Sequence, residues 1–445
     1  MPYQSTTLSQ LLGIVGSMMG DPGNIYWTPS EVSYAIWEGL RVWGSATGYW
    51  RSRGAFQQNP STQSPYYDLS IVLPQIRTRS YPLWRIVQEI QFLLLERPSP
   101  DGSISGTQMS QQLSLDVILS AIQIARNRFV YDARLPISVH ENFATAGPGN
   151  DLVSYPGSAI YIHKLYWQDT YSGVWTKVSR EDIWAIDKGV PWWSLQPSKP
   201  SLYSEAELSP LTLQLVPPPL NVGQLEGLTV DSVVIDTTNA LSTLQIPDEW
   251  VYAVKYAALA HILSSESQIR DETRAQYAEQ RYQQALEFAQ DFPYLVRLTA
   301  ANVPLVVDTL DALDRSSGYW RNYTGYPQSA ATLYDILVFN PGIAPNAHGI
   351  SADVIQPAPL PSLNDFIQLG QEDIDHLLQY VTHILRFKDG GTEFTSTMGL
   401  YDSYMKAIDR RKAVTSARVR YFEPLFGVYS REQGRKPDRK QPEAA

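Results

Sequence analysis

Residues 246–292 constrain the fold of this chain more than any other stretch. The run opens with a proline and two acidic residues (247–249), a pattern typical of a helix start. Apolar residues then recur at helical spacing through 251–263, and a polar break at 264–268 precedes a second periodic run that Pro293 ends. The pattern predicts a helical hairpin, each arm of which has one apolar and one polar face. Each apolar face has to be buried, either in its own domain or against a neighbouring subunit.

Bulky side chains on this hairpin are candidates for contact between copies of the chain. Aromatic residues are enriched where protein surfaces meet, and this chain has 27 Tyr and 12 Trp against 12 Phe. The same excess also suits large aromatic cores, and both interpretations remain open. The candidate oligomer-interface residues are Trp250, Val254, Tyr277, Tyr282 and Phe288.

Composition excludes several classes of function. A chain of 445 residues is too long for one compact core, so two or three domains are expected. The absence of cysteine excludes disulfides, thiolate metal sites and cysteine nucleophiles. A formal net charge of −10 argues against broad coating of nucleic acid. No apolar run is long enough to span a bilayer, and no signal peptide is visible, so we expect a protein made in a cytoplasm-like compartment and without membrane contact.

Periodicity changes along the chain and predicts an α+β fold: a helical-hairpin or bundle core with an inserted antiparallel β module. The residues Thr28 to Glu31 (TPSE) have the form of a capping box and give the clearest single helix start. Alternating and β-branched runs predict the strands of the module. The expected division is 1–135, an N-terminal helical region; 136–245, the antiparallel β module; 246–300, the central hairpin; 301–362, a proline-rich extended arm; 363–426, a C-terminal helical pair; and 427–445, a mobile charged tail.

Motifs that carry chemistry are missing or isolated. The P-loop, GxGxxG, HExxH and GxSxG patterns do not occur, and we expect neither an enzyme nor a cofactor or metal site. Two acidic pairs, Asp311/Asp314 and Asp373/Asp375, could serve glycoside hydrolysis, but a structural role is the simpler interpretation. His376 and His383 are seven residues apart on a predicted helix, too far for joint ligation of one ion.

Tryptophans in the predicted β module leave a second function class open. Exposed indoles stack on sugar rings, so a tail-associated glycan-binding or fibre-attachment protein is the alternative hypothesis. Use in a core or interface is the competing interpretation. The residues concerned are Trp167, Trp175, Trp184, Trp192 and Trp193.

Several runs resemble head-to-tail connector (adaptor) proteins of the necks of tailed phages. The run from Leu211 to Leu225 (LTLQLVPPPLNVGQL), then 246–250 (IPDEW) and the alanine-rich helix after it, carries the resemblance, together with 365–369 and 387–394. The similarity is good over 211–295 and moderate over 363–412. Many adaptors are much smaller, so the N-terminal helical region and the β module look like additions.

The resemblance implies a structural virion protein at the head–tail neck, assembled in the host cytoplasm. It implies a dodecameric ring docked beneath the portal protein and bound to tail or other neck proteins. DNA would pass through the lumen without sequence-specific binding. From residue 406 onward, eleven Lys and Arg stand against five Asp and Glu, so this basic end is the expected portal-contacting arm. The candidate portal-contact residues are Arg418, Arg420, Arg431, Arg435, Lys436, Arg439 and Lys440.

Overall fold

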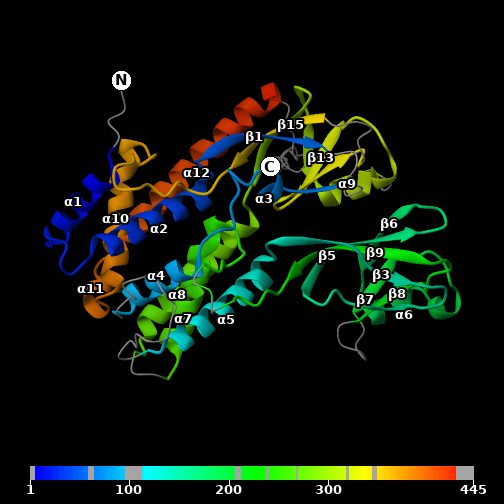
Figure 1. Ribbon diagram of the computed structural model, residues 1–445, viewed down its shortest axis with the longest axis horizontal. Helices are drawn as coiled ribbons and strands as arrows, with labels where there is room; N and C mark the ends of the chain where they lie inside the picture. Colours follow the sequence, from blue (N-terminus) through cyan, green and yellow to red (C-terminus); the bar gives the residue numbers. More distant parts are fainter. Residues whose placement is uncertain are drawn as a thin grey trace, which may run out of the picture.

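The structure, a computed structural model, describes residues 6–58, 65–95, 113–205, 212–236, 239, 241–266, 269–316, 320–342 and 348–426, without the side chains of 348 and 414–426. The fold is α+β, as the sequence predicts. A helical body occupies one end of the molecule and two β-rich lobes occupy the other (Figure 1).

The helical body combines helices from both halves of the chain. Its longest N-terminal helix, α2, begins with the predicted capping box, in which Thr28 Oγ1 accepts from the Glu31 amide at 3.3 Å. It ends at Gly48, which has a left-handed φ of 58°. The helices of the body are α1 (Leu8–Met18), α2 (Pro29–Thr47), α4 (Leu83–Leu93), α5 (Leu115–Ala133), α7 (Val251–Ser264), α8 (Glu272–Gln290), α10 (Gln371–Phe387), α11 (Gly391–Thr395) and α12 (Met398–Phe426).

The predicted central hairpin is present as α7 and α8. A short 3-10 helix, η2 (Asp248–Trp250), leads into α7, and Asp271 caps α8 by accepting from the Arg274 amide. The prediction of a polar face on α7 is wrong. From Val251 to Leu263, His261 is the one exposed residue. The reason is that α2, α4, α5 and α8 all contact α7, so the helix is enclosed and needs no polar side.

One lobe is the β module, a seven-stranded sheet in the order β3-β9-β5-β6-β7-β8-β4. Its pairs are antiparallel except β6–β7, which run parallel because α6 (Ile183–Gly189) and η1 (Trp193–Leu195) cross over between them. The strands are β3 (Ile137–Ala146), β4 (Leu152–Ser154), β5 (Ala159–Asp169), β6 (Trp175–Arg180), β7 (Leu202–Glu205), β8 (Thr212–Val216) and β9 (Gly223–Asp231).

The region expected as an extended arm, 301–362, is instead largely built into sheets. One sheet has the order β1-β15-β10-β11 and the other β12-β13-β14-β2, so β1 and β2 pair with strands that lie between 268 and 304 positions later. Proline content suggested an arm because prolines break local patterns. The edge strand β11 nevertheless contains Pro304, and β12 to β15 contain no proline. The elements are β1 (Arg51–Gln58), β2 (Tyr66–Asp68), α3 (Leu69–Val72), β10 (Leu295–Ala300), β11 (Val303–Pro304), β12 (Val306–Thr309), α9 (Leu310–Ser316), η3 (Trp320–Asn322), β13 (Ser329–Leu333), β14 (Ile336–Asn340) and β15 (His348–Ile355).

Three apolar cores follow this division. The largest is continuous through the helical body and the β1–β15–β10 sheet. A second lies inside the β module, and a third joins that module to the β13–β14 sheet and α9. Within the described residues, no helix is both long and apolar enough to cross a membrane.

Candidate functional site

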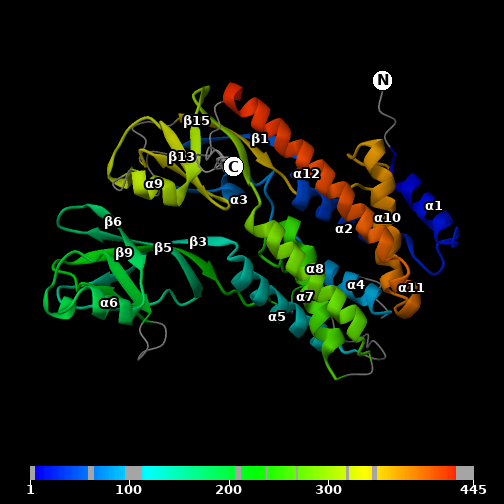
Figure 2. The same cartoon turned by 180° about the vertical axis from the view of Figure 1, so that it is seen from behind.

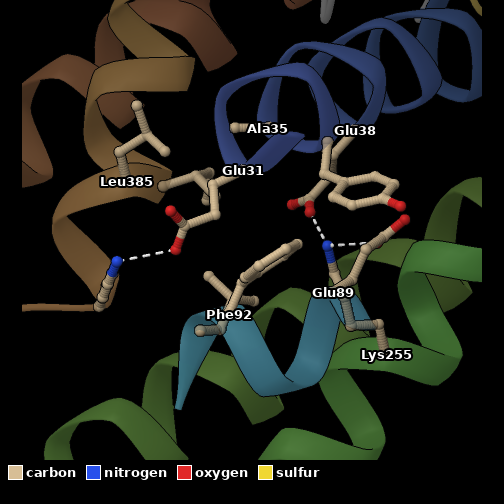
Figure 3. A pocket seen from close by; sticks show the side chains of 11 residues that line it. Glu31, Ala35, Glu38, Glu89, Phe92, Lys255 and Leu385 are labelled. Atoms are coloured by element: carbon tan, nitrogen blue, oxygen red, sulfur yellow. Dashed lines mark hydrogen bonds and ion pairs between the residues drawn. The ribbon is translucent and has the colours of Figure 1, made fainter. Parts of the chain in front are cut away.

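A cluster of buried charges lies at the centre of the helical body. Lys255 on α7 forms ion pairs with Glu38 on α2 and Glu89 on α4, and its Nζ lies 3.0 Å from Glu89 Oε2 (Figure 3). All three side chains are at most 2% exposed. Glu38 also accepts hydrogen bonds from the hydroxyls of Tyr256 and Tyr380, each at 2.6 Å. The cluster therefore connects four helices that are distant in sequence.

The electrostatics of this cluster are those of a structural ion pair. Burial, with a contribution from the Arg281 guanidinium, lowers the pKa of Lys255 to about 7. Burial also raises the pKa of Glu89, which Arg41 opposes from 3.7 Å. With a pKa of about 7 Lys255 is partly protonated at neutral pH, and the two carboxylates within hydrogen-bond reach favour its ammonium form.

The space beside the cluster is too small for a substrate. A partly open cavity of about 30 Å³ lies between Glu31, Glu89, Lys255 and Lys388 and is also lined by apolar side chains such as Phe92. This volume holds one or two water molecules. The charges here accordingly stabilise helix packing and do not surround a metabolite.

The two histidines noted in the sequence, His376 and His383, differ in how deeply they are buried. His383 lies inside the body, where its Nδ1 contacts Thr397 Oγ1 at 2.8 Å and its Nε2 contacts the Tyr277 hydroxyl at 2.9 Å. Burial lowers the pKa of His383 to about 3, so the ring is neutral. His376 contacts Gln379 at 3.4 Å on the same helix. Among the described residues, no three His, Asp or Glu side chains gather where they could hold a metal ion.

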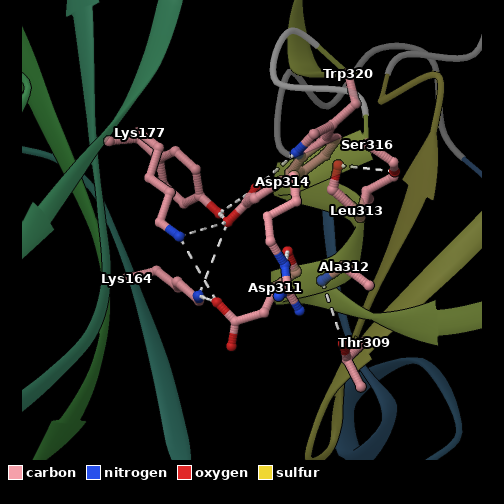
Figure 4. Close-up of polar contacts among 11 residues, drawn as sticks. Lys164, Lys177, Thr309, Asp311, Ala312, Leu313, Asp314, Ser316 and Trp320 are labelled. Atoms are coloured by element: carbon pink, nitrogen blue, oxygen red, sulfur yellow. Dashed lines mark hydrogen bonds and ion pairs between the residues drawn. The ribbon is translucent and has the colours of Figure 1, made fainter. Parts of the chain in front are cut away.

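The Asp311/Asp314 pair forms part of the junction between the β module and the second lobe. Both aspartates project from α9 toward Lys164 on β5 and Lys177 on β6, and Lys177 Nζ lies 3.7 Å from each carboxylate (Figure 4). Burial alone would raise the pKa of Asp311, but the hydrogen bond and charge of Lys164 outweigh it and lower that pKa. The Tyr166 hydroxyl donates to Asp314 at 3.2 Å. These contacts hold the module against the lobe.

A second set of contacts closes the same junction. Arg321 donates to Glu226 on β9 at 2.6 Å, and its guanidinium lies 3.9 Å from the centre of the Trp175 ring. The Trp175 amide donates to Asn322 Oδ1 at 2.9 Å. Trp175, one of the tryptophans considered for sugar stacking, is therefore a packing residue of the junction.

Several large apolar side chains in and after α6 of the β module are exposed, and we call this set the tryptophan tip. Of the seven residues in α6, Ile186 alone is buried. Trp184 and Trp192 are each 72% exposed, and Leu195 is 71% exposed. The tryptophan tip comprises Trp184, Val190, Trp192 and Leu195. Exposed apolar surface of this kind marks an interaction site.

Local structure fixes the tryptophan tip in place. Asp182 caps α6 by accepting from the Trp184 amide at 2.8 Å. Trp192 has a φ of 67°, a left-handed conformation that is strained for a bulky residue and that clusters at functional positions. Trp193 Nε1 donates to Asp187 at 2.7 Å, which ties η1 to α6. Two indoles are thus held outward by a rigid turn.

The candidate oligomer-interface residues lie mostly inside the chain itself. Trp250, Val254, Tyr277 and Tyr282 are at most 4% exposed. Phe288 is half-buried, with Lys412 Nζ 5.8 Å from its ring centre. A contact between copies stays a prediction, and in this conformation it needs other side chains.

The candidate portal-contact residues lie outside what the structure describes. Arg418 and Arg420 fall in the part of α12 whose side chains are not described, and the remaining five fall within 427–445. Their role stays a prediction.

The buried ion pairs were not predicted, although the sequence contains a signal for them. Lys255 is the single charged residue in the apolar run 251–263. A lysine in a helix that is apolar all round has to find a buried carboxylate. The partners, Glu38 and Glu89, are 166 or more positions away, and no local pattern identifies them.

Comparison with known proteins gives one match. The family model described as SU10 adaptor protein matches residues 86–308. The match runs from α4 through the whole β module to β12, so the module is part of the family's common region and not an addition. It does not include 363–412, where the sequence showed moderate resemblance. No curated protein matches the chain.

Proposed function

Since the chain belongs to the SU10 adaptor protein family, half of it matching that family's model, we propose that it acts as the head-to-tail connector of a tailed phage. Membership makes the protein a structural adaptor of a phage and a component of the virion. The proposal adds the position: copies of the chain form a ring between the portal protein and the tail, and DNA passes through it. A formal net charge of −10 supports passage, because an acidic wall repels the phosphate backbone.

The tryptophan tip is the observation that carries the proposal. An adaptor has to hold a second protein, and buried tryptophans are the commonest strong anchors of protein interfaces. The β module, one of the two lobes away from the helical body (Figure 1), presents two such side chains, Trp184 and Trp192. Ion pairs between Lys164 and Asp311 hold the module in position. We therefore assign the tryptophan tip to contact with a neighbouring neck or tail protein.

The basic C-terminal end supplies the second proposed contact. Residues 406–445 have six more positive than negative charges, whereas the rest of the chain is acidic. This end suits an acidic surface on the portal protein. Deleting 415–445 is expected to abolish docking to purified portal rings while leaving the fold of the helical body unchanged by circular dichroism. Docking that persists after the deletion rejects this assignment.

Substituting the tip tests the proposal directly. The variant Trp184→Ser/Trp192→Ser removes two exposed anchors, each worth about 2 kcal/mol or more at a well-packed interface, so binding to the neighbouring virion protein should weaken by roughly 100-fold or more. Tyr171→Ser is the matched control, since Tyr171 is 90% exposed on another loop of the module. Co-sedimentation with tail assemblies measures the effect. Equal binding by both variants contradicts the proposal.

A glycan-binding or fibre-attachment function is the second candidate, and the same two exposed indoles favour it. Of the other tryptophans considered, Trp167 is buried and Trp175 stacks on Arg321. A glycan array probed with the full chain discriminates the two functions. Specific sugar binding that is lost on Trp184→Ser would favour the second candidate, and native mass measurement of rings would favour the first.

A further inference from the structure

Two chain segments, one after α5 and one after β9, join the β module to the helical body, and the contacts beside them lie close together. Arg126 on α5 donates to the Asp231 carbonyl at the end of β9 at 3.4 Å, and Arg134, just after α5, donates to the Tyr161 hydroxyl near the start of β5 at 3.0 Å. Among the described residues of the module's strands, Val230 is the one buried apolar side chain that joins the core of the helical body. These contacts all lie at the base of the module, the end at which it joins the helical body, so they act near any axis about which the module could turn.

The second lobe, which consists of the β12-β13-β14-β2 sheet with α9 and η3, lies beside the module in both views of the molecule (Figures 1 and 2). Its contacts are further from the base: Lys164 on β5 pairs with Asp311, and the Tyr166 hydroxyl donates to Asp314 at 3.2 Å (Figure 4). Tyr166 is five residues beyond Tyr161, which is about 17 Å along a strand at about 3.3 Å per residue. Because their lever is longer, these contacts resist rotation of the module more strongly than the contacts at the base.

The sheet of the second lobe is apolar on both faces. Leu337 and Phe339 on β14 belong to the core of the helical body, whereas Ile336 and Val338 belong to the core shared with the module. All four side chains are at most 1% exposed. Successive side chains of a strand point to opposite faces, so one face of this sheet packs on the helical body and the other on the module. The second lobe therefore fixes the module relative to the helical body.

Arg321 of the second lobe contacts three strands of the module at once. Its guanidinium lies 4.6 Å from the centre of the Tyr166 ring on β5 and 3.9 Å from that of the Trp175 ring on β6. It also donates to Glu226 on β9 at 2.6 Å, and both side chains of this ion pair are 5% exposed. Separating the two units would leave each of these charges without its partner, which opposes any movement of the module away from the lobe.

We propose that the second lobe, and not the two chain connections, sets the direction in which the β module leaves the helical body, with Asp311 and Arg321 as the positioning residues. The fixed direction would orient the tryptophan tip toward its partner. That use of the direction rests on the proposed function, whereas the mechanical role of the lobe does not.

Distances between spin labels test this inference in the full-length chain. From Tyr161 to Asp169, the end of β5, the strand measures about 26 Å, so a rotation of about 15° would move this end by about 7 Å. Because the natural chain has no cysteine, labels attach only at the introduced residues of Tyr171→Cys/Ile124→Cys. Tyr171, just beyond β5, is 90% exposed, and Ile124, on α5, is 47% exposed. Double electron–electron resonance should give a narrow distribution of this module–body distance.

Two release variants loosen the contact from opposite sides. Asp311→Lys/Arg321→Gln changes the second lobe, and Trp175→Leu/Lys177→Glu changes the module. Each should broaden the module–body distance by about 7 Å, because the module can then turn about its base. Glu205→Lys is the matched control: Glu205 is 47% exposed against 58% for Asp311, but its ion pair lies within the module, so the distance should stay narrow.

A second label pair, Tyr171→Cys/Leu152→Cys, reports the fold of the module itself and should be unchanged in both release variants. The two variants alter different units, so a loss of fold in one leaves the other to decide. A module–body distance that stays narrow while the module remains folded means that the connections set the direction, and it overturns the inference. Failure of the connector proposal would appear as absent binding to virion proteins and would leave these distances as they are.

Discussion

Replacing Lys255 with methionine measures how strongly the helical body depends on its buried ions. Methionine has a similar length but no charge, so Glu38 and Glu89 would stay buried without their common cation. Both carboxylates are at most 2% exposed, and solvent therefore screens little of the loss. The substitution separates the packing of Lys255 from its charge.

The magnitude follows from the partners that remain. Removing one member of a buried ion pair typically destabilises a protein by about 3–5 kcal/mol. Glu38 keeps two hydroxyl donors at 2.6 Å, and Glu89 keeps the Tyr81 hydroxyl and Arg41. These partners place the expected loss near the lower limit, about 3 kcal/mol, which is roughly 100-fold in the local opening equilibrium.

Hydrogen exchange resolves this loss by region. Amides of α7 should exchange about 100-fold faster in Lys255→Met, whereas amides of β5 and β9 should be unchanged, because regions of a protein open separately. The double variant Lys255→Met/Glu38→Gln, in which Glu89 keeps its ion pair with Arg41, should recover most of the protection. Unchanged exchange in α7, or equal acceleration in the β module, would refute the reasoning.

Further predictions concern acid stability, a helix cap and a close contact. His383 has a pKa of about 3 when folded against an ordinary 6.5, so its contribution is complete above pH 6.5 and declines as the pH falls toward 3. This residue alone should make unfolding easier by ~2 kcal/mol at pH 5 than at pH 7, and His163, whose pKa burial lowers to about 4, adds to the same slope; His383→Gln should reduce the slope in urea titrations by its own share. Thr28→Ala should remove about 1 kcal/mol of stability through loss of the α2 cap, with the exposed Ser30→Ala as control in thermal melts. Gly223→Ala should destabilise the β module, because a Cβ there would overlap the buried Trp167 ring; unaltered near-ultraviolet circular dichroism would contradict this.

Local signals predicted the helices well. The capping box at Thr28 and the acidic starts at 247–249 and Asp271 are each determined by neighbours in sequence, and the structure has helices at all three positions. Alternating and β-branched patterns between 158 and 235 likewise indicated strands where β5, β6, β8 and β9 lie, but they did not indicate β3. Structural features that depend on a few neighbouring residues can be predicted from a single sequence.

The features that could not be predicted from the sequence are those that depend on long-range packing. The polar face expected on α7 is absent because four helices enclose it, and nothing within 251–263 encodes that number of neighbours. The strands β15 and β14 pair with β1 and β2, so these two sheets form only when distant segments of the chain meet. The five tryptophans of the β module looked alike, yet Trp167 is buried and Trp184 is exposed. Tertiary context decides such differences.

The β module enters through β3 and leaves through β9, and these two strands pair directly, with Ile137 opposite Val230. The two chain connections between the helical body and the β module therefore lie next to each other. A module whose two ends adjoin can be lengthened, shortened or exchanged without moving the helical body that carries it. Under the proposed function, exchanging the module that carries the tryptophan tip would change the partner that is bound and leave the helical body as it is.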